Sequence, residues 1–178
     1  EIGDISPAMQ IRLLRVLQDR TEALISLQDI GQALTTTAGL DDLAARVCRH
    51  ACDLCGHACR VDRYERLGTC NTGTRASVAS YHPHLGEEDP LRGWRGSGTI
   101  FFSRCNLHCQ FCQNYDISQL GRGEETEPQD IASAMVALQA RGCHNINFVS
   151  PTHVAAPILA AVLVAAEAGL RLPLVWNT

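Results

Sequence analysis

Three cysteines with the spacing Cys-x3-Cys-x2-Cys are the residues of this chain with the most evident chemistry. Cys105, Cys109 and Cys112 come directly after the mostly apolar run of residues 99–103. A closed zinc site takes four protein ligands, and an ordinary iron–sulfur cubane takes four cysteines. Three thiolates on one short loop therefore leave one metal position open, where a substrate or a cofactor can bind.

A second group of four cysteines lies upstream, with the spacing Cys-x2-Cys-x3-Cys-x10-Cys. Its members are Cys52, Cys55, Cys59 and Cys70. Four thiolates can hold either Zn2+ or an iron–sulfur cluster, and spacing does not choose between the two. We expect a metal-binding knuckle whose closed ligand shell leaves no place for catalysis. Three further residues are near enough in sequence to replace one ligand, namely Cys48, His50 and His57.

Composition limits the classes of protein to which the chain can belong. The 178 residues carry a net charge of −4, which argues against a nucleic-acid partner. Every apolar run is shorter than the roughly 18 to 20 residues of a membrane span. The longest candidate, residues 154–166, is interrupted by Pro157. Nine cysteines in a chain without a visible signal peptide indicate reduced thiols, so we expect a cytoplasmic protein with no membrane partner.

The elements that must position the cysteine loop follow a regular order after Gly98. Hydrophobic patterns predict three strands, at residues 99–102, 145–149 and 174–176, and two helices, at residues 128–141 and 154–168. This alternation predicts an α/β fold with parallel βαβ units, whose ligands gather at the carboxyl ends of the strands. Polar residues follow each strand, at 103–105, 150–153 and 177–178. By contrast, residues 71–98 are rich in Gly and Pro and predict a loop with at most a short strand at 78–81.

The N-terminal residues 1–47 predict a helical lead-in that resembles pieces of regulatory proteins. Residues 1–20 resemble the segment after the Walker B strand in AAA+ activators of the alternative sigma factor. Residues 21–47 resemble the start of a GAF sensory domain. The chain contains no Gly-x4-Gly-Lys-Ser/Thr loop to cradle phosphates, so the first resemblance carries no ATPase function.

Four stretches together resemble a different family over about three quarters of the chain. They are CDLCGHACRVDR (52–63), GSGTIFFSRCNLHCQFCQNYDISQ (96–119), HNINFVSPTH (144–153) and LPLVWNT (172–178). The chain resembles the N-terminal half of radical S-adenosylmethionine (SAM) proteins of the pyruvate formate-lyase activating enzyme-like branch. The resemblance implies a partial parallel (βα) barrel with about three βα units at residues 96–178, preceded by the helical segment 1–47 and a Cys-rich metal knuckle and loop at 48–95.

The resemblance also implies an oxidoreductase chemistry. Cys105, Cys109 and Cys112 would hold three irons of a 4Fe–4S cluster, and SAM would chelate the fourth. One electron would then cleave SAM to methionine and a 5′-deoxyadenosyl radical. Phe111 would pack against the adenine, with ordinary core packing as its other interpretation. Three residues, Ser150, Thr152 and His153, stand with Pro151 where many members carry Gly-Gly-Glu-Pro, so Thr152 is a candidate SAM contact.

The third strand end adds Asn177 as another candidate SAM contact. The implied partners are a protein substrate of the glycyl-radical type and an electron donor such as flavodoxin or ferredoxin. Two alternatives stay open: a non-catalytic metal-binding module that holds zinc or an iron–sulfur cluster, and a fragment of a sigma-factor activator or GAF regulator. A full barrel has about six βα units, so we expect residues 1–178 alone to be poorly stable or inactive.

Overall fold

The computed structural model describes Cys52 and residues 55–178. These residues belong to one compact unit, Ala44–Thr178. The predicted helical lead-in at residues 1–47, with its AAA+-like and GAF-like resemblances, lies outside the described residues, as do Cys48 and His50.

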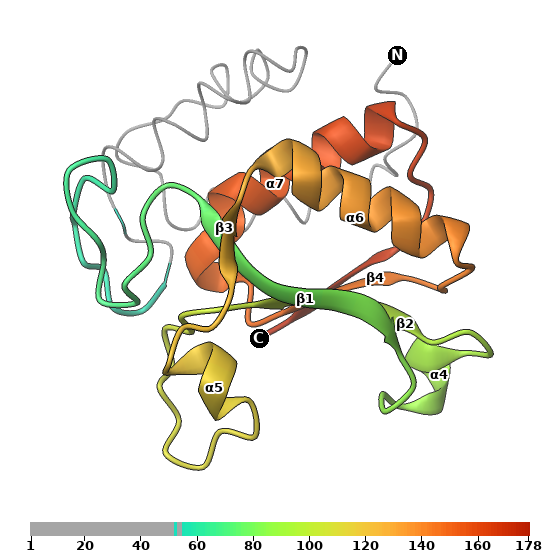
Figure 1. Cartoon of the computed structure of the whole chain (residues 1–178), viewed down its shortest axis with the longest axis horizontal. Helices are drawn as coiled ribbons and strands as arrows, with labels where there is room; N and C mark the ends of the chain where they lie inside the picture. Colours follow the sequence, from blue (N-terminus) through green and yellow to red (C-terminus); the bar gives the residue numbers. More distant parts are fainter. Residues whose placement is uncertain (1–51, 53–54) are drawn as a thin grey trace. The chain divides into compact units, whose positions relative to one another are not determined.

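Three parallel strands and two connecting helices form the regular half of the described unit. The strands are β2 (Ser97–Phe102), β4 (Ile146–Val149) and β5 (Leu174–Asn177), and α6 (Pro128–Ala140) and α7 (Ala155–Glu167) connect them. Both helices lie on the same face of the sheet (Figure 1). These bounds agree with the predicted strands and helices to within two residues. The α/β class and the predicted βαβ order are therefore present in this part of the chain.

An antiparallel half extends the sheet in the order β3-β1-β2-β4-β5. The strand β1 (Ala76–His84) pairs with β2 on one side and with β3 (Glu124–Thr126) on the other. The prediction of a loop over residues 71–98 was thus wrong for the nine residues of β1, which include the possible short strand at 78–81. Pro83 is tolerated near the end of β1. The strand β3 pairs only with residues 76–78, so no neighbouring strand needs a backbone N–H from Pro83 on that side.

The remaining helices are short and lie in the connections. They are α4 (Asp89–Arg92), α5 (Tyr115–Ser118) and the 3-10 turn η1 (Thr152–Val154). The cysteine loop runs from β2 to α5, and η1 follows β4, so both segments lie beyond the carboxyl ends of parallel strands. Among residues 52 and 55–178, no helix is long and apolar enough to cross a membrane.

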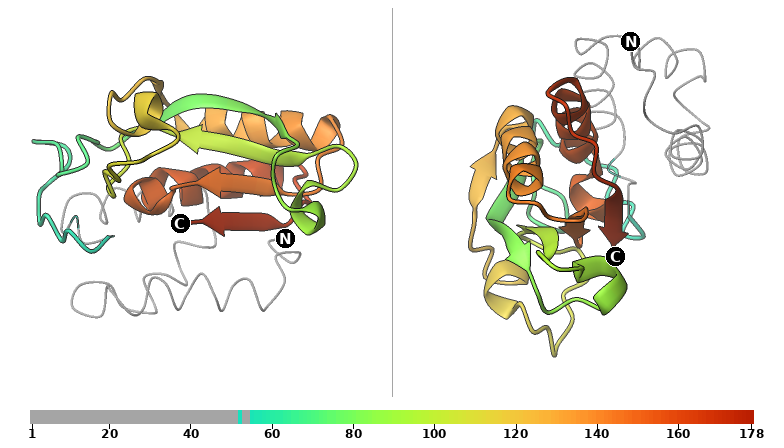
Figure 2. Two further views of the ribbon diagram at one scale, coloured as in Figure 1. Left: turned by 90° about the horizontal axis from the view of Figure 1, so that it is seen from below. Right: turned by 90° about the vertical axis from the view of Figure 1, so that its right-hand side faces the viewer.

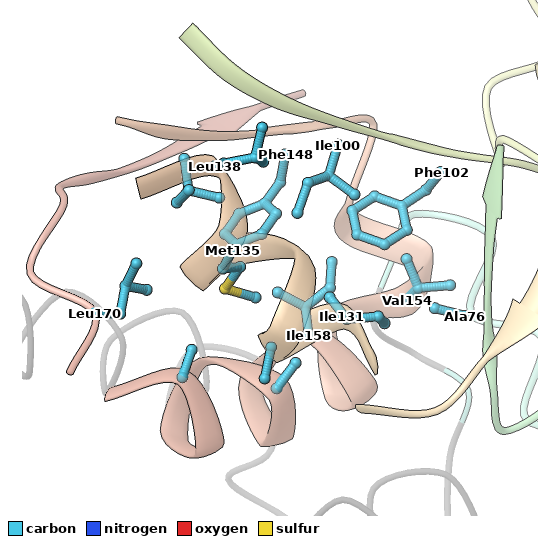
Figure 3. Packing of buried hydrophobic residues seen from close by; sticks show 14 of the residues in the cluster. Ala76, Ile100, Phe102, Ile131, Met135, Leu138, Phe148, Val154, Ile158 and Leu170 are labelled. Carbon is cyan, nitrogen blue, oxygen red and sulfur yellow. The ribbon is translucent and has the colours of Figure 1, made fainter. Parts of the chain in front are cut away.

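The hydrophobic core lies between the sheet and the two long helices (Figure 3). Ile100 of β2 and Phe148 of β4 are register partners, and both side chains are almost completely buried. Met135 and Leu138 of α6 and Ile158 of α7 cover them from the helical side. Successive residues of a strand point to opposite faces, so this packing fixes the strand register and with it the positions of the strand ends.

Candidate metal and cofactor site

The carboxyl ends of the parallel strands bring the predicted polar residues to one edge of the sheet. The three strands point toward the same side of the molecule (Figure 2). At this edge the Ser150 N–H donates to the Asn177 carbonyl at 2.8 Å. The hydroxyls of Thr152 and Thr178 lie 2.9 Å apart. The two predicted SAM contacts, Thr152 and Asn177, therefore lie on neighbouring strand ends.

The cysteine loop leaves β2 at the same edge and turns sharply twice. Arg104 and His108 have positive φ angles, 61° and 49°. The loop places its three cysteines at different depths: Cys105 is buried, Cys112 is half-buried and Cys109 is exposed. The Cys112 N–H donates to the Cys109 carbonyl at 3.2 Å, which closes the last turn of the motif.

Two sulfur atoms of this loop already receive hydrogen bonds from neighbouring donors. The Leu107 N–H donates to Cys105 Sγ at 3.4 Å. The Ser118 hydroxyl, at the end of α5, donates to Cys112 Sγ at 3.2 Å. Each of these two sulfurs thus has a hydrogen-bond donor beside it, and neither sulfur is bound in a disulfide.

The second cysteine group forms a knuckle, made of Cys52 and residues 55–73, that places three sulfurs around Gly68. The atoms nearest to the place of a Cβ on Gly68 are the Sγ atoms of Cys52, Cys59 and Cys70, at 3.6, 3.7 and 3.7 Å. Cys55 is buried in the same knuckle, and its carbonyl accepts the N–H of residue 58 at 3.0 Å. Three of the four predicted ligands thus lie around the same glycine.

A buried arginine lies against these sulfurs. Arg63 is only 5% exposed. Its Nη2 donates to Cys52 Sγ at 2.8 Å and its Nε donates to the same sulfur at 3.2 Å. Burial raises the pKa of Cys52, and the Arg63 guanidinium works in the opposite direction. Hydrogen bonds from Thr69 lower the pKa of Cys59. Burial thus outweighs the guanidinium at Cys52, whereas Thr69 favours the thiolate of Cys59.

The donor chemistry of both cysteine groups fits a metal, although neither is assembled as a finished site. Within residues 52 and 55–178, no group of three or more His, Cys, Asp or Glu side chains is arranged so that it could hold a metal ion. All the described cysteines carry free thiols, which are the soft donors that zinc and iron–sulfur clusters take. Metal binding to such ligands is generally coupled to folding, so a metal bound by either group would have to bring its ligands closer together.

Phe111 occupies the outer part of the cysteine loop. Its side chain is 92% exposed. The interpretation as ordinary core packing is therefore wrong. Contact with an adenine stays a prediction. The exposed ring has room for a planar partner on its face.

Sequence reasoning missed the contacts that join the two cysteine groups. The His57 ring Nε2 lies 2.7 Å from the Asn106 carbonyl oxygen, so His57 forms a hydrogen bond with the cysteine loop. His153 is completely buried, and its Nε2 donates to the Ser103 carbonyl at 2.9 Å. Arg63 Nη1 donates to the His153 carbonyl at 2.6 Å. No local sequence pattern predicts these contacts, because 49 to 90 positions separate the two residues of each pair.

The comparisons with known proteins leave the activity open. No family model matches the chain, and no solved structure matches it. An uncharacterized protein of Methanocaldococcus jannaschii is 33% identical over 137 residues. This match covers 71% of the chain and 38% of the archaeal protein. The chain thus spans well under half the length of the relative that it matches.

Proposed function

We propose that the chain is a radical SAM iron–sulfur protein, similar to the activating proteins of glycyl-radical enzymes. The observation that carries the proposal is the Cys-x3-Cys-x2-Cys loop at the carboxyl end of β2, beside the polar ends of β4 and β5. A 4Fe–4S cluster held by Cys105, Cys109 and Cys112 would supply the one electron that the reductive cleavage of SAM to methionine and a 5′-deoxyadenosyl radical requires.

In this proposal the chain's own residues hold and orient the reactants. Cys105, Cys109 and Cys112 would hold the cluster through their sulfurs. The donors to the sulfurs, the Leu107 N–H and the Ser118 hydroxyl, disperse the negative charge of the thiolates. The exposed face of Phe111 covers the adenine and limits its contact with water.

The strand ends bind the polar parts of SAM. The Thr152 hydroxyl, the Asn177 side chain and the nearby backbone carbonyls present donors and acceptors for an ammonium, a carboxylate and ribose hydroxyls. The implied partners are a protein substrate of the glycyl-radical type and a one-electron donor such as flavodoxin or ferredoxin. Free thiols on both cysteine groups favour a reducing compartment, so we propose the cytoplasm.

A second candidate function rests on the knuckle. The three sulfurs around Gly68 and the buried Arg63 favour a metal at Cys52, Cys55, Cys59 and Cys70, either zinc or an iron–sulfur cluster. If this were the chain's only metal, the protein would be a non-catalytic metal-binding module. The regulator alternative rests on residues 1–47 alone and would require ATP or effector binding.

Anaerobic reconstitution of the intact gene product tests the main proposal. Iron and sulfide are added to the wild type, to the triple variant C105A/C109A/C112A and to Cys143→Ala as a control. Cys143 is a buried core cysteine outside both groups. We expect cubane absorption and dithionite-dependent formation of 5′-deoxyadenosine in the wild type and the control, and loss of the SAM cleavage in the triple variant. Zinc alone, with no iron taken up and no SAM cleaved, would support the metal-binding module instead.

A further inference from the structure

We propose that Arg63 is a positioning residue that couples metal binding in the knuckle to the order of the SAM-facing edge. This inference rests on the proposed metal site at the four upstream cysteines, and it does not depend on a cluster in the Cys105 loop. Its basis is a chain of buried contacts that runs from Cys52 through Arg63 and His153 to Ser103.

The first link is a match of charge. A guanidinium with 5% exposure has lost most of its hydration, so it needs anionic or strongly polar neighbours. The recorded acceptors of Arg63 include the sulfurs of Cys52 and Cys70. Four thiolates around one Zn2+, or around one oxidised cubane, leave a net negative charge on the centre. A metal in the knuckle would therefore keep its ligands anionic beside this buried cation and hold the guanidinium in place.

The second link is the other arm of the same guanidinium. Arg63 Nη1 donates to the carbonyl of His153 at 2.6 Å. His153 belongs to η1, the turn that also carries Thr152. The planar guanidinium presents several N–H groups in a fixed fork, so one side chain can bind a sulfur and a carbonyl at the same time.

The third link reaches the cysteine loop. The buried His153 ring donates to the carbonyl of Ser103, the residue at which the chain leaves β2. Cys105 follows only two positions later. The His57 contact with the Asn106 carbonyl is a second bridge between the knuckle and this loop. A metal that closes the knuckle would thus order both η1 and the start of the loop.

Substitutions at Arg63 can separate charge from geometry. Arg63→Lys keeps a cation beside the sulfurs but loses the fork that reaches the His153 carbonyl. Arg63→Ala loses both. Arg66→Ala is a matched control, because Arg66 lies on the same segment with an exposed side chain.

The test uses the full chain with C105A/C109A/C112A in every sample, so that metal enters only the knuckle. Co2+ titration, read from its thiolate charge-transfer absorption, measures affinity. Amide hydrogen exchange of residues 150–154 is compared in Zn2+-loaded and chelator-stripped protein. We expect removal of the metal to speed this exchange roughly tenfold in the parent protein, which keeps Arg63, and in the Arg66→Ala control. Arg63→Lys should bind Co2+ within about threefold of the parent affinity, yet residues 150–154 of the metal-loaded variant should exchange as fast as those of the metal-free parent. Arg63→Ala should lose both the Co2+ affinity and the metal-dependent protection.

Two results would overturn the coupling. One is protection of residues 150–154 that does not change when the metal is removed. The other is slow amide exchange of residues 150–154 in Zn2+-loaded Arg63→Lys, equal to that of the Zn2+-loaded parent chain. Should Arg63→Ala fail to fold, Arg63→Lys with an unchanged far-ultraviolet circular dichroism spectrum decides the question. A knuckle that binds neither Co2+ nor Zn2+, and takes up no iron–sulfur cluster on reconstitution, would overturn both this inference and the second metal site, whereas absent SAM cleavage would overturn only the proposed catalysis.

Discussion

At the scale of single residues, Gly68 lies beside three of the knuckle sulfurs. A Cβ at this position would lie 3.6 to 3.7 Å from three sulfurs, which is ordinary contact. We therefore expect Gly68→Ala to bind close to one metal per knuckle. Gly68→Val adds two methyl groups near the sulfurs, and overpacking of this kind costs about 1–3 kcal/mol. Its metal content, measured by elemental analysis after gel filtration, should fall to less than about half of that of the wild type.

Gly56→Ala is the matched control for this pair. Its added Cβ would meet no atom within 4 Å, and Gly56 lies in the same knuckle. Full metal loading of Gly68→Val would show that the sulfurs meet somewhere other than around Gly68.

His153 should give the protein a pH dependence of defined sign. Burial lowers the pKa of His153 below its ordinary value of 6.5. As the pH falls below that value, His153 binds a proton in the unfolded chain but stays neutral in the folded chain, so the free energy of unfolding decreases. One such group contributes at most about 1.4 kcal/mol per pH unit. Urea unfolding of metal-stripped protein at about pH 7.5 and about pH 5.5 measures the loss.

The comparison with His153→Gln isolates this group. Glutamine keeps an N–H donor for the Ser103 carbonyl but does not titrate. We expect the variant to lose less stability than the wild type between the two pH values. Equal losses in both proteins would show that His153 is not the group that titrates.

At the scale of elements, β2 and the turn before β4 pack too closely for any side chain at Gly98. A Cβ there would lie 2.6 Å from the Asn145 carbonyl oxygen, a backbone atom that cannot move without β4. Gly98→Ala should therefore destabilise the fold by about 1–3 kcal/mol in urea unfolding. Gly73→Ala is the control, since its nearest neighbour would be at 3.5 Å, and it should stay within about 0.5 kcal/mol of the wild type. An unchanged Gly98→Ala midpoint would contradict the observed pairing.

The cysteine loop is an element whose apolar residues add little to stability. Phe111 is 92% exposed and Leu107 is 60% exposed. Replacing either by Ala should change unfolding free energy by less than about 0.5 kcal/mol. Only Phe111→Ala should weaken SAM binding to reconstituted protein, by roughly tenfold, because a stacked ring is lost. Calorimetric titration of SAM checks this, and equal affinity in both variants would remove Phe111 from the SAM site.

The elements also differ in how far the sequence could predict them. The helices α6 and α7 and the strands β2, β4 and β5 are rich in apolar residues and alternate along the chain, so the local sequence pattern predicts them. The strand β1 reads ASVASYHPH, with few large apolar residues. Pairing on both sides makes it a strand, and pairing is a property of the whole sheet.

The same division holds for the candidate site. The spacing of the cysteines predicted which thiols belong together, and three of the upstream four do meet around Gly68. The buried contact of Arg63 with His153 joins residues 90 positions apart, and no short motif encodes it. Contacts of this kind depend on how loops dock after the core has formed.

At the scale of the whole molecule, the apolar core and the cysteines that we predict as metal ligands occupy separate regions of the described residues. Among the described residues, Cys143 is the one cysteine in the core cluster, and it belongs to neither cysteine group. Removing metal with a chelator should therefore leave the helical circular dichroism signal of α6 and α7 nearly unchanged. Hydrogen exchange should stay slow in β2 and β4 and become faster in residues 55–73, because local opening follows local contacts. If chelation instead unfolded the core strands together with the knuckle, metal binding and the core would form one cooperative unit, and the separation that the packing indicates would be wrong.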